Sequence, residues 1–155
     1  MGDSPYAHLA YGYNLGGKEG GWKLQGADEY GTFDFDWTEG GYGFADDVAA
    51  RLIVAAGFTE TREEGKPDWY RRRREAENAL GVEVERSGHH EHPGWMLVAT
   101  GSQRRVEWAD AMVLDLRELE HPPNEWFEHL TAAVETLGIT PTQDWPKWLV
   151  FPSYG

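Results

Sequence analysis

Three glycines, each placed between two apolar residues, end the stretches of this sequence that have helical periodicity. They lie in the triplets Ala56-Gly57-Phe58, Leu80-Gly81-Val82 and Leu137-Gly138-Ile139. Glycine adopts a left-handed backbone conformation at little steric cost, and the apolar residue after it folds back onto the last helical turn. The triplets therefore predict three helix ends, and these ends fix the architecture better than any other feature of the chain.

The helices that lead to these glycines follow from apolar spacing and from start signals. Helical spacing over residues 45–56 predicts the first helix, with an apolar face of Val48, Leu52, Ile53 and Ala56. Pro67 and Asp68 predict the start of a second helix that runs to Leu80. Pro122 and Pro123 open a third helix, whose predicted apolar face is Trp126, Phe127, Leu130, Val134 and Leu137.

Alternating residues predict the strands. In residues 8–15 the large apolar side chains face one way and the small or polar ones face the other, which is typical of a strand. Residues 16–21 then turn into a second strand, 22–25, to form a hairpin. Further strands are predicted over residues 82–86, 95–100, 103–108, 111–116 and 148–151, and a single helical turn over residues 116–119.

Two strands, two helices, three strands, a helix and a strand do not alternate regularly, which disfavours a doubly wound parallel sheet. The order predicts an α+β fold in one domain, residues 1–155. We expect a single, mostly antiparallel sheet of five to six strands, with three helices packed chiefly on one face.

Composition limits the compartment and the partners. The chain has no cysteine, which excludes disulfides and thiolate sites and predicts a cytoplasmic protein. No apolar run approaches the length needed to span a membrane. The net charge of −13 repels nucleic-acid backbones, so direct binding to DNA or RNA is not expected.

The segment between the hairpin and the first helix is the predicted binding site. Residues 27–43 are rich in glycine and aspartate, and aromatic side chains are interspersed among them. Exposed aromatic residues among carboxylates are typical of interface anchors. We predict a binding module for a partner protein, with binding residues Tyr30, Asp34, Phe35, Asp36, Trp37 and Tyr42.

Two alternatives remain open. In the run His89-His90-Glu91-His92, the residues His90, His92 and Glu91 could chelate a metal, which would suit a metal-dependent enzyme or a metal sensor. The negative charge would also suit a DNA mimic that inhibits a nucleic-acid enzyme. No cofactor is predicted, and no serine lies in a Gly-x-Ser-x-Gly nucleophile motif, so a binding protein is favoured over an enzyme.

Several segments also resemble a protein family. They are HLAYGYNLGG (residues 8–17), GWKLQ (21–25), ARLIVAAGFTET (50–61) and LGITPTQDWPKWLVFPSYG (137–155). Together they resemble a family of small acidic proteins from actinobacteria and their phages. The resemblance implies an actinobacterial or phage origin, and it implies no catalytic residue.

Overall fold

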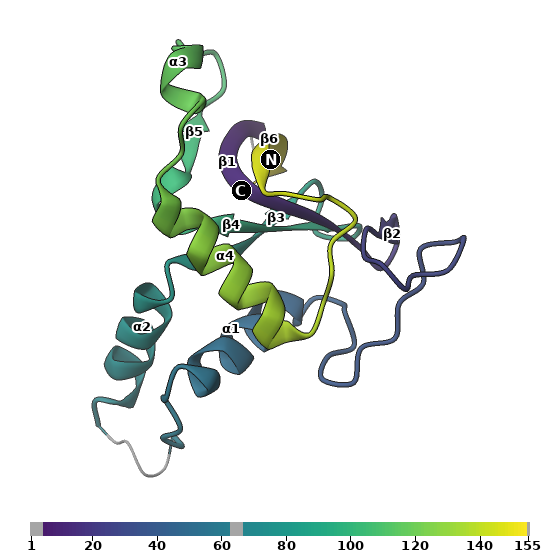
Figure 1. Cartoon of the computed structure of the whole chain (residues 1–155), viewed down its shortest axis with the longest axis vertical. Coiled ribbons are helices and arrows are strands. Elements are labelled where there is room, and N and C mark those ends of the chain that lie inside the picture. The colour runs from purple at the N-terminus through teal and green to yellow at the C-terminus, as the bar shows by residue number, and fades with distance from the viewer. Residues whose placement is uncertain (1–4, 63–66, 155) are drawn as a thin grey trace.

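Figure 1 shows a computed structural model of the chain, which describes residues 5–62 and 67–154. The helices are α1 (Phe44–Ala55), α2 (Trp69–Ala79), α3 (Leu116–Leu119) and α4 (Asn124–Leu137). The strands are β1 (Pro5–Gly17), β2 (Gly21–Trp22), β3 (Val82–Ser87), β4 (Gly94–Ala99), β5 (Arg104–Val106) and β6 (Lys147–Tyr154). These strands form one six-stranded antiparallel sheet, so the predicted α+β class is confirmed.

The long strand β1 organises the sheet, because β2, β4, β5 and β6 all pair with it. Gly12 of β1 lies opposite both Val98 of β4 and Lys147 of β6, which places β4 and β6 on the two edges of β1. The strand β3 then pairs with β4. A Cβ atom at position 12 would collide with the carbonyl oxygen of Leu97, so glycine is required for β1 and β4 to approach this closely.

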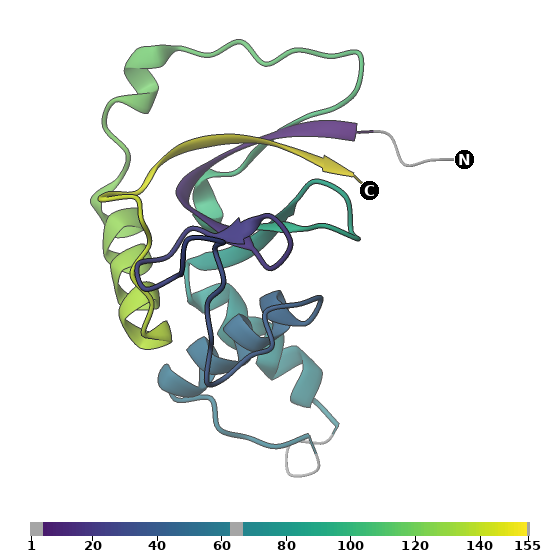
Figure 2. The same ribbon diagram turned by 90° about the vertical axis from the view of Figure 1, so that its right-hand side faces the viewer.

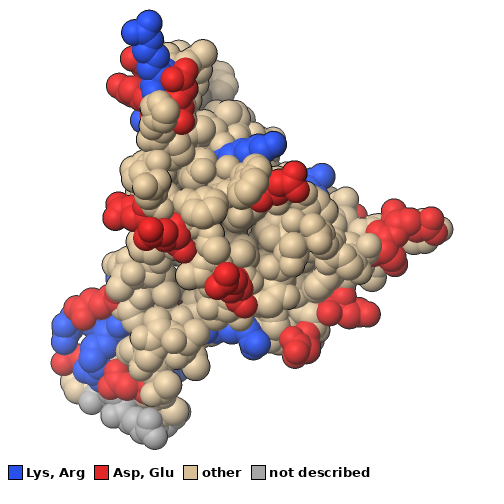
Figure 3. All heavy atoms as spheres, in the orientation of Figure 1, with Lys and Arg blue, Asp and Glu red and all other residues tan. Residues whose placement is uncertain are grey.

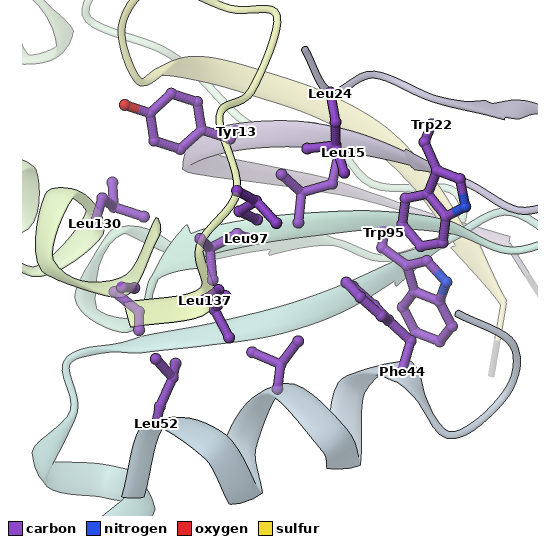
Figure 4. Close-up of a cluster of buried hydrophobic side chains, with 14 of the residues drawn as sticks. Tyr13, Leu15, Trp22, Leu24, Phe44, Leu52, Trp95, Leu97, Leu130 and Leu137 are labelled. Carbon is purple, nitrogen blue, oxygen red and sulfur yellow. The ribbon is translucent and has the colours of Figure 1, made fainter. Parts of the chain in front are cut away.

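One face of the sheet carries the main apolar core. Tyr13 and Leu15 of β1 are buried on this face, together with Leu97 of β4. Figure 4 shows these side chains facing residues from α1 and α4, among them Phe44, Leu52, Leu130 and Leu137. Figure 2 shows the three longer helices on this side of the sheet, so the predicted layering is confirmed.

The three predicted helix ends are also confirmed. Gly57, Gly81 and Gly138 have φ angles of 105°, 73° and 67°. At the end of α4 the N–H of Gly138 donates to the Glu135 carbonyl, and the N–H of the buried Ile139 donates to the Val134 carbonyl. This pair of bonds satisfies carbonyls that the helix leaves unpaired. None of the described helices combines the length and the apolar character that crossing a membrane requires.

The strand predicted over residues 111–116 is wrong. Residues 111–115 form neither helix nor strand, and Leu116 is the first residue of α3. The chain leaves the sheet after β5, whose partner is β1, and Ala109 takes a positive φ of 67° that redirects the backbone. The segment 107–115 contains no helix or strand. We call residues 107–121, which include α3, the arm, because Figure 1 shows them projecting from the rest of the molecule.

Two smaller predictions also need correction. The second strand of the hairpin is only two residues long, although the N–H of Lys23 still donates to the Leu15 carbonyl at 2.9 Å. In α4, Phe127 is exposed and Ala133 is buried, so the apolar stripe runs through Leu130, Ala133 and Leu137. Trp126 and Val134 of the predicted face are half-buried and pack against the main core, so Phe127 is the member of that face that was wrong.

The opposite face of the sheet is closed because the sheet curls until its strands β3 and β6 meet. The N–H of Gly88, after β3, donates to the Pro152 carbonyl of β6 at 2.9 Å. The hydroxyl of Ser153 in β6 donates to the Arg86 carbonyl of β3, also at 2.9 Å. The strands at the two edges of the sheet therefore meet at one end. The curl encloses a second, smaller apolar cluster of Ala10, Met96, Val98 and Phe151.

Candidate functional site

The segment between β2 and α1 has an inward row of aromatic side chains. We call residues 28–43 the acidic loop. Phe33, Phe35 and Trp37 are half-buried and pack against the main core. The ring of Phe35 lies 4.8 Å from that of Trp22, 5.5 Å from that of Trp37 and 5.8 Å from that of Phe44, measured between ring centroids. The inward row therefore anchors the loop to the core.

Hydrogen bonds fix both ends of the acidic loop. At its start, a carboxylate oxygen of Asp28 accepts from the N–H groups of Tyr30 and Thr32, both at 2.9 Å. At its end, the hydroxyl of Thr38 donates to a carboxylate oxygen of Asp47 at 2.6 Å. Asp47 lies in the first turn of α1, where the helix dipole favours a negative charge. The N–H of Trp22 in β2 also donates to the Gly31 carbonyl at 2.8 Å, so the loop is tied to β2 at one end and to α1 at the other.

The outward row of the acidic loop is polar and negative. Asp34 and Asp36 alternate with the anchoring rings and are exposed. Tyr30 and Tyr42 are 81% and 69% exposed, respectively. Residues 24–50 contain seven carboxylates and no Lys or Arg. Figure 3 shows several carboxylates on the side of the molecule where this loop lies.

The six predicted binding residues therefore fall into two groups. Tyr30, Asp34, Asp36 and Tyr42 reach solvent, whereas Phe35 and Trp37 face the core and hold the loop. The sequence contained a signal for this division, because Phe-Asp-Phe-Asp-Trp alternates with the two-residue period of extended chain. The alternation predicts which side chains share a side of the segment.

The histidine run does not gather in the predicted way. His89, His90 and Glu91 each offer a ligand atom within 4.8 Å of the others, and His92 is not part of this group. The N–H of His92 donates to the His89 carbonyl at 3.1 Å, so the chain turns between these two residues. Of the predicted ligands, the structure brings His90 and Glu91 together and places His89, rather than His92, beside them.

A polar cluster on the curled face was not predicted. His8 is buried and stacks on Phe151, with ring centroids 4.8 Å apart, and neither of its ring nitrogens has a hydrogen-bond partner among the described residues. Burial lowers the pKa of the His8 imidazole below its ordinary value. The sequence placed His8 opposite the large face of β1, but it gave no indication that the sheet would curl over that residue.

Glu83 and Glu85 of β3 belong to the same cluster. Burial and the nearby charge of Glu83 raise the pKa of Glu85 to about 7. The side-chain amide of Gln103 donates to a carboxylate oxygen of Glu83. A neutral imidazole and a carboxyl group that titrates near pH 7 could exchange protons with a ligand. None of the clefts described below, however, is lined by both His8 and Glu85.

One cleft among the described residues is too small for an ordinary small-molecule site. This cleft of about 250 Å³ lies between α1, α2 and β3 and is lined by aliphatic side chains and by Asp46, Glu77 and Glu83. This volume is below the range common for small-molecule sites, and the lining holds no cation to pair with an acidic ligand. A more open groove of about 500 Å³ lies beside the arm and includes Trp108 and Val150.

No family model, curated protein or solved structure matches the chain.

Proposed function

We propose that this protein is a binding module that recognises a basic surface of a partner protein through its acidic loop. The observation that carries the proposal is the division of the loop between an inward and an outward row. Phe33, Phe35 and Trp37 fix the segment against the core, while Asp34 and Asp36 face solvent between them. A binding surface held in this way loses little conformational freedom when a partner binds.

The outward side chains have the chemistry of a protein interface. Tyr30 and Tyr42 supply large, amphipathic contact surfaces with few rotatable bonds, and tyrosine is enriched in interfaces and among their dominant residues. The carboxylates would attract a partner rich in Lys and Arg and would accelerate association. The same charge disfavours a nucleic-acid partner, because phosphates would be repelled.

A DNA mimic is the competing use of a negative surface, and it receives no support from the face in Figure 3. Mimicry of a duplex requires acidic groups in rows with the spacing of phosphates. In Figure 3 the Asp and Glu side chains lie in separate groups, some of them beside Lys and Arg. We therefore favour recognition by a local patch on the acidic loop.

The resemblance to small acidic proteins of actinobacteria and their phages directs the search for the partner. We propose that the partner is a cytoplasmic protein of an actinobacterial cell, which a phage-encoded protein would meet after infection. The absence of cysteine suits a reducing compartment of this kind.

The proposal is tested by comparing tyrosine variants in affinity capture from an actinobacterial lysate. The test variant is Tyr30→Ser/Tyr42→Ser, and the matched control is Tyr70→Ser, which removes a similarly exposed tyrosine from α2. We expect at least one basic protein to be recovered by the wild type and by the control. Its recovery should fall by about tenfold or more with the double variant, as for dominant interface residues.

Circular dichroism must first show that all three proteins have the same secondary structure and melting temperature. Equal recovery of every captured protein by the wild type and the double variant would refute the acidic loop as the binding surface.

A further inference from the structure

The turn between β3 and β4 gathers three metal-ligating side chains from consecutive residues. His89, His90 and Glu91 are exposed, and their ligand atoms lie within 4.8 Å of one another. The two imidazole rings have centroids 4.2 Å apart. We propose that these three residues form a surface site for a divalent transition-metal ion of the zinc class. This site is separate from the acidic loop, and the proposal does not depend on the proposed function.

The distances suit coordination of a single ion. The Nδ1 atom of His89 lies 3.9 Å from the Oε2 atom of Glu91. Two ligand atoms bound tetrahedrally to zinc at about 2.1 Å are about 3.4 Å apart, so small side-chain rotations are sufficient. The Nδ1 atom of His89 now accepts from the N–H of Glu91 at 3.2 Å. An imidazole nitrogen has one acceptor lone pair, so this hydrogen bond must open before Nδ1 binds an ion.

The backbone restricts the movement of these ligands. The N–H of Gly88 donates to the Pro152 carbonyl at 2.9 Å, and the N–H of His92 closes a turn onto the His89 carbonyl at 3.1 Å. Ser87 pairs with Gly94 directly below the turn. The three side chains therefore extend from a short loop that is pinned to β6 and closed by β3 and β4. A pinned loop reduces the entropy that metal binding must overcome.

The donor set defines the class of metal. Two imidazoles and a carboxylate suit zinc, cobalt and nickel, whereas magnesium and calcium prefer sites made only of oxygen ligands. Three protein ligands leave at least one position for water or for a donor from another molecule. The site could therefore attach a further ligand to the end of the sheet where β3 and β6 meet.

Isothermal titration of the tag-free, full-length protein with zinc chloride tests the proposal. We expect saturation at one zinc ion per chain and no saturable binding of magnesium. Removing one ligand, by His89→Ala or His90→Ala, should weaken zinc binding by about tenfold or more. The control His92→Ala changes an exposed histidine of the same turn and should bind zinc like the wild type.

Cobalt provides a second readout, because its visible absorption reports coordination by imidazole and carboxylate. The spectrum should be the same for the wild type and His92→Ala and should be lost in His90→Ala. The proposal would be overturned by the absence of saturable zinc binding, by equal affinity of the wild type and His90→Ala, or by an equal loss in His92→Ala. The last result would favour chelation by His90 and His92 instead.

Discussion

The two faces of the sheet are built from alternate residues of the same strands, yet they are closed in different ways. The helix-covered face is closed by α1, α4 and the inward row of the acidic loop, and its core consists of apolar side chains. The curled face is closed by the meeting of β3 and β6, and it holds His8 and Glu85 beside a small apolar cluster. The buried polar atoms of the helix-covered core belong to ring side chains such as Tyr13 and Trp95, whereas the curled face holds an imidazole and a carboxyl group.

This difference bears on the proposed function, because the acidic loop belongs to the helix-covered face. Phe35 and Trp37 extend the main core beneath the loop, so the outward row rests on a rigid support. The arm provides a contrast, since Trp108 and Val113 are 74% and 94% exposed and do not anchor it. Of these two irregular segments, the acidic loop is the one with a pre-formed surface.

The largest expected effect on stability concerns Leu97 and Met96, neighbouring residues of β4 whose side chains lie on opposite faces of the sheet. Leu97 is fully buried in the main core, and Met96 lies in the small cluster of the curled face. We expect Leu97→Ala to lower the free energy of unfolding by about 3 kcal/mol and Met96→Ala by about 2 kcal/mol, because the smaller cluster can relax. Urea denaturation measures both. A larger loss for Met96→Ala would contradict the comparison.

A smaller effect on stability should distinguish the inward row of the acidic loop from its outward row. We expect Phe35→Ala to lower the free energy of unfolding by about 2 kcal/mol, because the half-buried ring contacts Trp22, Trp37 and Phe44. Tyr42→Ala removes an exposed ring and should change stability by less than about 0.5 kcal/mol. Similar losses for the two variants, measured by thermal melting, would show that the rows are not distinct.

On the curled face, His8→Phe should stabilise the protein. Phenylalanine keeps the stacking on Phe151 and removes two buried nitrogens that lack partners, so we expect a gain of about 1 kcal/mol at pH 7.5. The gain should be larger at pH 5. Because folding lowers the pKa of His8, the folded state binds fewer protons at this residue than the unfolded chain, whose imidazole takes up a proton below about pH 6.5. A loss of stability at both pH values would contradict this account of His8.

The smallest effect should come from Glu85→Gln. The folded pKa of about 7 lies above the ordinary value of 4.5, so the folded state holds more protons than the unfolded state between these values. Stability contributed by this group therefore falls as the pH rises from 4.5 to 7. We expect Glu85→Gln to be more stable than the wild type by up to about 1 kcal/mol at pH 8, with solvent screening considered. The difference should shrink towards pH 4.5, and a pH-independent difference would refute it.

The sequence was sufficient for the features that depend on local chemistry. The positive φ angles at Gly57, Gly81 and Gly138 followed from a local steric rule, and the strand around residues 8–15 followed from strict alternation. The choice of strand partners depends on distant residues and was not accessible in this way. Nothing near Arg104 indicates that β5 pairs with β1 or that the chain leaves the sheet after β5.

The candidate site was predictable to a similar degree. Composition located the acidic loop, but the division between Tyr42 and Trp37 depends on where the core ends. Which histidines lie close to Glu91 depends on a turn, because the hydrogen bond from the His92 N–H to the His89 carbonyl reverses the chain. His8 was missed because its burial arises only when β3 and β6, which are far apart in sequence, come together.

The central claim is that the outward row of the acidic loop binds a basic protein. The most direct test is the affinity of the purified captured partner for Asp34→Asn/Asp36→Asn and for Glu118→Gln/Glu120→Gln. Both variants remove two exposed carboxylates with the same sequence spacing, so they change the net charge equally, but the second pair lies on the arm. We expect the loop variant to bind about tenfold more weakly and the arm variant to bind like the wild type. Equal weakening of the two variants would show that net charge, and not the acidic loop, is responsible for binding.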